Sequence, residues 1–366
     1  MSLQVVARAR GRAERIASRL ETGKALATLF HQSTPATRYW RISLPAKYLP
    51  GREIPAHHVW VRHDVKRDKL TFPQLRGDTA IVQYPGDNGA ALLAMAMEAK
   101  GKRMFVEVDD NYAEYADELW MKRADWGRVI KGDKATSVAG HRWIVEHSYG
   151  VIVTTRALKA AYSELNDNVH ICRNSIDPTD WPDPAPRDNV FRIGWYASNS
   201  HDRDSAMVAN ALSWASRQPG VKVINIGHDP GWRFNRTQIE WADSFLDQRK
   251  HLRRLDVGVS PLVLSPLAKY RSDLKALEYA MGGAMPFLQS SEPYWEWSDK
   301  EFARICHTPA DWANAIKWAV RNQDEVRARA QQARGYVLAE RTIQKEIACW
   351  REAIRGGGGD GLSDAD

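Results

Sequence analysis

The sequence has few of the features that define several large classes of protein. Its 366 residues contain only three cysteines, Cys172, Cys306 and Cys349, which lie far apart and show no Cys-x-x-Cys or Cys/His spacing. We therefore expect buried free thiols in place of a disulfide framework or a structural zinc site. No run approaches the roughly 20 apolar residues of a membrane span, and the N-terminus has no apolar signal core. A cytoplasmic protein without a membrane span is expected.

The positive charge is unevenly distributed along an otherwise ordinary globular composition. Hydrophobic residues make up 43% and charged residues 27%, and a chain of this length can bury two cores. The first 70 residues contain 14 Lys and Arg against 5 Asp and Glu, whereas the remainder contains 38 against 40. The net charge of +7 therefore belongs to the N-terminal part. Such a field attracts nucleic acid or anionic membrane surfaces, and a solvated arginine-rich helical face is the alternative interpretation.

Hydrophobic periodicity predicts an α/β protein. Residues 1–37 suit a basic helical extension. From residue 38, short apolar runs alternate with helix-like stretches such as 90–100 and 156–165, which is typical of βαβ units around a parallel sheet. The runs predicted to form strands in this half are RYWRISL, HHVWV, TAIVQY, RMFVEV, GVIVTT and VHICRN.

A proline-rich segment separates two such patterns. Pro178, Pro182, Pro184 and Pro186 disfavour a continuing helix or a central strand. We therefore predict one Rossmann-like domain over residues 38–188 and a second over 189–345. A long charged helix over about 323–355 and a glycine-rich tail follow, so that residues 346–366 are assigned to the end of that helix and a disordered tail. Strands predicted in the second half are FRIGWYAS, VKVINIG, DVGVSPL and AMPFLQS.

The segment RSDLKALEYAMGGAMPF carries the strongest functional pattern. Ligands of doubly wound sheets bind beyond the carboxyl ends of the strands, and this segment follows the predicted strand DVGVSPL. Arg271 and Lys275 share one helical face, and Glu278 lies three residues further on. Cations near a helix N-terminus suit a diphosphate, and a carboxylate one turn later suits ribose hydroxyls. A surface helix with a Lys275–Glu278 ion pair is the alternative.

This segment resembles the donor-binding signature of GT-B-fold glycosyltransferases, especially glycosyltransferase family 4 and its phage-encoded relatives. In that signature a Lys/Arg-Ser-x-x-Lys-x-x-Glu run precedes Gly-x-Pro and a strand, so that Glu278 matches the ribose-binding glutamate. The resemblance implies two Rossmann-like domains facing a cleft, the first binding the acceptor and the second a nucleotide sugar. It extends to the end of the first domain, where the matching residues are Thr154, Thr155, Asn174, Ile176 and Asp177.

IGWYASNSHDRD resembles the strand and loop that open the donor domain of this family. The resemblance implies that donor phosphates bind there, beside Gly194, Ser198, Asn199, Ser200, His201 and Arg203. Arg203, Arg271 and Lys275 are alternative partners for the diphosphate. Two positions depart from the family pattern. Tyr270 replaces the acid that contacts the transferred sugar, and Trp195, which we expect near the donor, replaces the arginine of the usual Gly-Arg pair.

Asp109 and Asp110 end a predicted strand in the run FVEVDDNY. A carboxylate at such a strand end can act as general base on an acceptor hydroxyl. Phage-type relatives resemble this run, with Glu107 in place of their first aspartate. The alternatives are the metal-binding Asp-x-Asp motif of the other large glycosyltransferase fold, which the two-domain pattern disfavours, and a helix N-cap by Asp110 or Asn111. His57, His58 and His63 flank a short predicted strand of the first domain and are interpreted as surface histidines, with a catalytic or acceptor-positioning imidazole as the alternative.

Together these patterns favour a glycosyltransferase that uses a nucleotide diphosphate sugar, assumed to be UDP-glucose, with no obligatory metal. The basic N-terminal part and the phage-type resemblance favour 5-hydroxymethylcytosine or a similar pyrimidine in bacteriophage duplex DNA as acceptor, with the base turned out of the stack. Transfer to a virion protein or a cell-surface glycan is an alternative. A non-catalytic DNA-binding protein on the same scaffold is another, and a dinucleotide-dependent oxidoreductase lacks its Gly-x-Gly-x-x-Gly turn.

Overall fold

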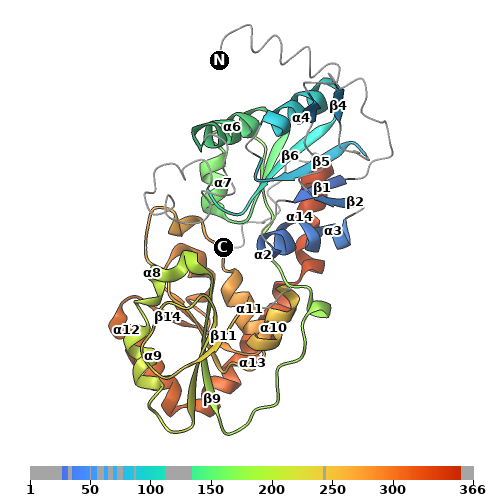
Figure 1. Ribbon diagram of the computed structural model, residues 1–366. Helices are drawn as coiled ribbons and strands as arrows, with labels where there is room; N and C mark the ends of the chain where they lie inside the picture. Colours follow the sequence, from blue (N-terminus) through green and yellow to red (C-terminus); the bar gives the residue numbers. More distant parts are fainter. Residues whose placement is uncertain are drawn as a thin grey trace. The chain divides into compact units, whose positions relative to one another are not determined.

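Two parallel β-sheets organise the chain (Figure 1). The computed structural model describes residues 27–31, 35–49, 51–55, 62–64, 69–71, 77–85, 88–111, 134–241 and 245–355. The chain divides into two compact units. The first unit comprises Met1–Arg173 with Glu346–Asp366, and the second comprises Asn174–Lys345. The predicted α/β class with two parallel sheets is confirmed.

The first unit contains a six-stranded sheet in the order β2-β1-β5-β6-β7-β8, and each pair of neighbours is parallel. A separate antiparallel pair is formed by β3 (Arg62–Asp64) and β4 (Lys69–Thr71). The strands of the main sheet are β1 (Ala27–His31), β2 (Gly51–Pro55), β5 (Thr79–Gln83), β6 (Arg103–Val108), β7 (Gly150–Val153) and β8 (Val169–Ile171). The helices are α2 (Pro35–Arg38), α3 (Leu44–Tyr48), α4 (Asn88–Ala99), α6 (Lys134–His147), α7 (Arg156–Tyr162) and α14 (Ile343–Arg355).

Two segments at the start of the first unit differ from the prediction. Residues 27–31, assigned to the helical extension, form β1 inside the sheet, whereas residues 1–26 lie outside the described part of the chain. The run RYWRISL, predicted as a strand, is helical, with a π-helical turn over Tyr39–Ser43 between α2 and α3. Short apolar runs do not distinguish a strand from a buried helix, because both are covered on all sides. The predicted strand HHVWV lies outside the described residues.

The second unit has its strands in the order β11-β10-β9-β12-β13-β14, all parallel. The strand order reverses between β9 and β12. Helices α9 and α12 cover one face of the sheet, and α10, α11 and α13 cover the other (Figure 1). The strands are β9 (Phe191–Ala197), β10 (Val221–Gly227), β11 (Thr237–Ile239), β12 (Val257–Ser260), β13 (Met285–Gln289) and β14 (Arg304–Cys306). The helices are α8 (Asp202–Ser205), α9 (Ala209–Ala215), α10 (Phe245–Leu252), α11 (Leu274–Gly282), α12 (Pro309–Arg321) and α13 (Gln323–Glu340).

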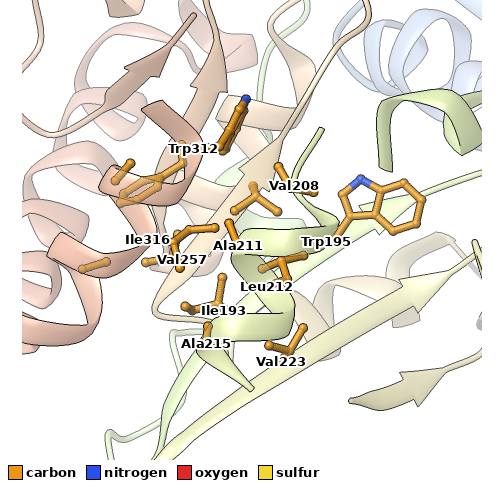
Figure 2. Packing of buried hydrophobic residues seen from close by; sticks show 14 of the residues in the cluster. Ile193, Trp195, Val208, Ala211, Leu212, Ala215, Val223, Val257, Trp312 and Ile316 are labelled. Carbon is orange, nitrogen blue, oxygen red and sulfur yellow. The ribbon is translucent and has the colours of Figure 1, made fainter. Parts of the chain in front are cut away.

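One contiguous apolar core holds helices α9 and α12 against the second sheet (Figure 2). Its strands are buried along almost their whole length, which is the pattern of a parallel sheet covered on both faces. The side chains labelled in Figure 2 are Ile193, Trp195, Val208, Ala211, Leu212, Ala215, Val223, Val257, Trp312 and Ile316.

Gly258 in β12 allows a close approach of α11. A Cβ at this position would lie 2.1 Å from Cγ of Tyr279. The Tyr279 hydroxyl donates to the Val259 carbonyl (3.1 Å) and accepts from the Tyr196 amide (3.0 Å), so that α11 is attached to both β12 and β9. The missing side chain of Gly258 therefore positions the helix that carries Glu278.

We expect Gly258→Ala to lower the free energy of unfolding by about 1–3 kcal/mol, because the added methyl group overpacks the Tyr279 ring. Urea denaturation measures this change. Gly335→Ala is the matched control, because nothing lies within 4 Å of a Cβ at this helical position. Equal effects of the two substitutions would contradict the packing role of Gly258.

The two units meet in the sequence at Arg173, earlier than the boundary predicted after residue 188. The proline-rich segment packs on the second unit: the Ile176 amide donates to the Arg341 carbonyl (2.8 Å), and the Ala185 amide donates to the Arg253 carbonyl (2.9 Å). Prolines exclude regular structure but do not prevent packing. The helix predicted over 323–355 consists of α13 and α14, which are separated at 341–342.

The three thiols behave as predicted from their spacing. Cys172 and Cys306 are buried, Cys349 is partly buried, and all are free. Burial raises the pKa of the Cys306 thiol to about 12 and also raises the pKa of Cys172, so neither is a ready nucleophile.

Among the described helices, none combines the length and the apolar character that a membrane crossing needs.

Candidate functional site

The carboxyl ends of β9 and β12 flank the point where the strand order of the second sheet reverses. Doubly wound sheets bind ligands at such points. A 3₁₀ turn (Asn199–His201) and α8 follow β9, and a loop leading to α11 follows β12. Asp204 joins the two segments, because one carboxylate oxygen accepts from the Val263 amide (2.7 Å) and the other lies 2.6 Å from Nδ1 of His201.

The start of α11 is held by a buried ion pair. Asp273 precedes the helix, and its carboxylate oxygens accept from Arg341 at 2.6 and 3.0 Å. Nε1 of Trp297 donates to the same carboxylate (3.0 Å), and Arg341 also donates to the Asn174 carbonyl (3.1 Å). At its other end α11 stops at Gly283, whose φ of 86° is the left-handed conformation of a helix C-cap. The helix is therefore fixed at both ends.

Glu278 lies in the middle of α11 and is 3% exposed. Its Oε1 is buried and has no hydrogen-bond partner among the described residues. Burial raises the pKa of this carboxyl to about 8, although the positive charges of Arg249 and Lys275 oppose the rise. Buried acceptors without partners are rare in folded proteins, so this one is suited to hydrogen-bond donors from a ligand. The alternative interpretation of Glu278 as a surface residue is wrong.

Arg271, Lys275 and His201 form a group of basic side chains, of which Lys275, together with Arg249, interacts electrostatically with Glu278. Burial lowers the pKa of Lys275 to about 8, and repulsion from Arg271 contributes to the decrease. His201 has its pKa lowered to about 4 by burial and by Lys275 and Arg271, against the opposing effect of Asp204. Cations that repel one another in a partly buried site are stabilised when an anion binds. The structure thus brings together four of the predicted donor residues.

Gly194 and Trp195 have structural explanations that need no ligand. Gly194 lies within β9, and a Cβ there would approach Cδ1 of Leu255 to 2.3 Å. Trp195 is fully buried and packs against Trp232 with 5.1 Å between ring centroids. The placement of Trp195 near the donor is therefore wrong, because alternate residues of a strand point to opposite faces and this one points into the core.

The remaining predicted donor residues lie around the loop that follows β9. Ser198 is partly buried, Asn199 is exposed, and Arg203 is an exposed residue of α8. Tyr270, which replaces the acid of the resembled family, is 3% exposed, and its ring lies 4.8 Å from Nζ of Lys269. Tyr270 thus supplies a buried aromatic ring where the family pattern has a carboxylate.

Trp241 is a candidate residue that the sequence patterns did not indicate. It follows β11, is 43% exposed, and packs edge-on against Tyr196 with 5.3 Å between ring centroids. A Cβ at Gly227 would lie 2.7 Å from the indole ring, so glycine lets Trp241 lie on the backbone at the end of β10. The pKa of Tyr196 is raised by burial and by Glu278, which places Tyr196 near both Glu278 and Trp241. No local spacing in the sequence indicates this position, because β11 was not predicted as a strand.

In the first unit, Asp109 and Asp110 follow β6 at its carboxyl end, as predicted. The Asp110 carbonyl accepts from the Tyr162 hydroxyl (3.4 Å), and this hydroxyl lies 3.0 Å from Nε2 of His141. Nδ1 of His141 lies 2.7 Å from the Pro85 carbonyl. Burial lowers the pKa of His141 to about 4, so it is neutral at pH 7 and serves as a link between the ends of β5 and β6.

The other acidic and histidine residues noted in this unit have different positions. Glu107 is fully buried, and its Oε1 accepts from Nε of Arg41 at 2.6 Å, so it serves as a core ion-pair partner. His57 and His58 lie outside the described residues, and His63 falls in β3 without a described side chain. Across the ranges that the structure describes, no group of three or more His, Cys, Asp or Glu side chains could hold a metal ion.

No protein-family model and no curated protein matches this chain, but solved structures do. HepE of Anabaena, solved with UDP-glucose, matches at a TM-score of 0.62 and 11% identity, over 90% of this chain and 100% of its own. The chain has the GT-B fold. The catalytic domain of starch synthase IV of Arabidopsis thaliana, solved with ADP and acarbose, matches at a TM-score of 0.60 and 9% identity. The match covers 92% of this chain and 99% of that domain. TarM, of which an S. aureus form is also solved, matches at a TM-score of 0.56 and 14% identity. The match covers 79% of this chain and 59% of TarM.

The GT-B fold agrees with the α/β class and the two Rossmann-like domains implied by the sequence resemblance. It contains two Rossmann-like domains, and the two units described above each supply one parallel sheet with covering helices. The chain spans the full length of HepE but only 59% of TarM. At these identities the similarity establishes the fold, and the chemistry depends on the residues of the site.

Proposed function

We propose that this chain is a glycosyltransferase that transfers a sugar from a nucleotide diphosphate sugar to a hydroxyl acceptor. The observation that carries the proposal is the buried Oε1 of Glu278, which has no hydrogen-bond partner among the described residues, on the helix that also carries Lys275, which in turn interacts with Arg271 and His201. A nucleoside diphosphate offers ribose hydroxyls to a carboxylate and a diphosphate to cations.

The donor is proposed to bind along the carboxyl edge of the second sheet. Its diphosphate would contact Arg271, Lys275 and His201, with Arg203 as a further cation, and its ribose would donate to Glu278. Trp241 would stack on the base. These cations would stabilise the charge that develops on the leaving diphosphate, so the proposal includes no obligatory metal. UDP-glucose is the proposed donor, because HepE, solved with UDP-glucose, has the same fold.

The acceptor is proposed to bind to the first unit, where Asp109 or Asp110 would act as general base. For its identity we propose a 5-hydroxymethylated pyrimidine in duplex DNA of a bacteriophage. This is supported by the excess of Lys and Arg in the first 70 residues, because such a charge attracts polyanions. A protein or glycan hydroxyl is the alternative acceptor.

The proposal is tested by incubating the protein with UDP-, ADP- and GDP-sugars, with either plain or 5-hydroxymethylcytosine-containing DNA. Nucleoside mass spectrometry should detect a sugar-sized mass gain on the modified nucleoside only. Release of nucleoside diphosphate on a protein or glycan acceptor alone would reject DNA and keep the enzyme class. Absence of release with every donor and acceptor would contradict the glycosyltransferase assignment.

Trp241→Ala is expected to raise the KM for the donor about tenfold or more, because stacking of a base on an aromatic ring contributes about 1–3 kcal/mol. The kcat should change little, since the base is remote from the reacting atoms. Initial rates at varied donor concentration measure both constants. Trp295→Ala is the control, because Trp295 is 62% exposed and does not belong to the proposed site. Equal KM values for the two variants would exclude a role of Trp241 in base binding.

A further inference from the structure

The carboxylate of Asp204 contacts both His201 and the loop that follows β12. Nδ1 of His201 lies 2.6 Å from Oδ2 of Asp204, and Oδ1 of Asp204 accepts from the Val263 amide at 2.7 Å. The exposed fraction of the side chain is 14% for His201 and 8% for Asp204. Both oxygens of Asp204 are therefore engaged, one by the imidazole and one by the loop after β12. The imidazole cannot rotate without breaking this connection.

The hydrogen bond to Asp204 determines which imidazole nitrogen is available to a ligand. An ionised carboxylate only accepts hydrogen bonds, so Nδ1 of His201 carries the hydrogen. In the neutral ring Nε2 is then an acceptor, on the side of the ring away from Asp204. An unprotonated Nε2 repels a phosphate oxygen, because both atoms are hydrogen-bond acceptors. Protonation of Nε2 would convert the same atom into a charged donor.

The charges around His201 explain why it is neutral when no anion is bound. Lys275 of α11 and Arg271 before it disfavour the imidazolium, burial disfavours it further, and Asp204 of α8 favours it. Glu278 of α11 also titrates in this site, with a pKa raised to about 8 by burial. Two further charged residues of α8 are largely exposed: Arg203, and Asp202, whose Oδ1 lies 3.0 Å from Nε2 of His228 after β10.

A bound diphosphate reverses this balance. Its negative charges offset those of Lys275 and Arg271, and one of its oxygens can accept from a protonated Nε2. The imidazolium therefore becomes more stable in the complex than in the empty protein. A proton that is bound more tightly in the complex must be taken up when the complex forms.

We propose that His201 takes up a proton when a nucleotide sugar binds and donates it as an Nε2 hydrogen bond to the diphosphate, with Asp204 as the positioning residue. This inference rests on the proposed function of the site. It assigns to Asp204 a role that the sequence patterns did not indicate. The sign of the pH dependence follows: donor affinity increases as the pH falls from neutrality toward the pKa of the empty protein, by at most about tenfold per pH unit.

Isothermal titration calorimetry tests this coupling, with UDP-glucose as probe. The sugar diphosphate is a diester without a titration near neutrality, so proton uptake at pH 6 reports on the protein. Titrations in several non-phosphate buffers with different ionisation enthalpies give the number of protons taken up. Because Glu278 releases a proton if ribose binding ionises it, the informative quantity is the difference between the wild-type protein and His201→Gln. We expect this difference to approach about one proton.

Asp204→Asn tests the positioning role. An asparagine keeps an acceptor for the Val263 amide, but it lacks the negative charge that favours the imidazolium. We expect the proton uptake to fall and the pH dependence of donor affinity to flatten, while circular dichroism shows an unchanged fold. A structural role alone would lower stability and leave the pH dependence intact.

Two outcomes separate this inference from the function on which it rests. Binding of UDP-glucose with equal proton uptake in the wild-type protein and His201→Gln would overturn the inference and leave the donor site standing. Failure of the wild-type protein to bind UDP-, ADP- and GDP-sugars would contradict the proposed function itself, and the inference with it.

Discussion

At pH 9, where the Glu278 carboxyl is ionised, replacing Glu278 by glutamine is expected to weaken donor binding about 100-fold, because each hydrogen bond to a charged group contributes about 1.5–3 kcal/mol. Glutamine has nearly the same volume, so the loss reports on charge and hydrogen bonding and not on packing. Titration calorimetry with UDP-glucose measures the change. Glu325→Gln serves as the control, because Glu325 lies on α13 and pairs with Arg329 at an exposed position. A ratio near one between the two variants would contradict the ribose-binding role of Glu278.

The same substitution should stabilise the empty protein at pH 8. The pKa of Glu278 is raised from 4.5 to about 8 in the folded state. Between these values the folded state binds a proton that the unfolded state releases, so this group makes stability fall as pH rises from about 4.5 to about 8. Glutamine does not ionise. We therefore expect Glu278→Gln to raise the Tm at pH 8 relative to the wild-type protein, with the difference shrinking toward pH 4.5.

Thermal unfolding followed by circular dichroism at pH 5 and pH 8 checks this expectation. A wild-type protein that is as stable as Glu278→Gln at pH 8 would show that the carboxylate has a partner in solution. Weaker donor binding and higher stability of Glu278→Gln would both arise from the loss of the buried carboxylate. A buried acceptor kept without a partner costs stability in the empty protein and becomes satisfied when the ligand binds.

Arg341→Met is expected to lower the free energy of unfolding by about 3–5 kcal/mol, because it leaves Asp273 buried without its partner. Arg341 is 1% exposed and donates twice to Asp273. Arg334→Met on α13 is the matched control, since Arg334 pairs with an Asp183 side chain that is 91% exposed. A loss below about 1 kcal/mol is expected there. Urea denaturation compares the two variants.

A double variant separates the unpaired charge from the lost contacts. If the cost of Arg341→Met arises from the isolated carboxylate, then Asp273→Asn combined with Arg341→Met should be less destabilising than the sum of the two single variants. Additive effects would show that the two side chains act independently. They would also contradict the role of the Asp273–Arg341 pair in fixing the start of α11.

The sequence was most informative where the relevant residues share one element. Lys275 and Glu278 lie three residues apart on α11, as helical spacing predicts, whereas Arg271, predicted on the same helical face, precedes the helix with an extended backbone and still interacts electrostatically with Lys275. Strands such as β9 and β10 were also predicted, because a parallel sheet buries them along their length. Local periodicity carries this information.

The sequence was least informative where a contact joins distant segments. The Asp204 carboxylate accepts a hydrogen bond from the amide of Val263, 59 residues away. Trp241 packs against Tyr196 and Gly227, which lie on two other strands. No local spacing reveals either contact. The same limit explains why β1 was assigned to a helix, since its partners β2 and β5 decide its conformation.

The central claim is that a nucleotide sugar binds to the second unit with its ribose on Glu278 and its diphosphate near His201, Arg271 and Lys275. A crystal structure with UDP-glucose tests it most directly. We expect ribose hydroxyls within hydrogen-bond distance of the Glu278 carboxylate. Well-defined density for the nucleotide elsewhere, with Oε1 of Glu278 still lacking a partner, would contradict the account.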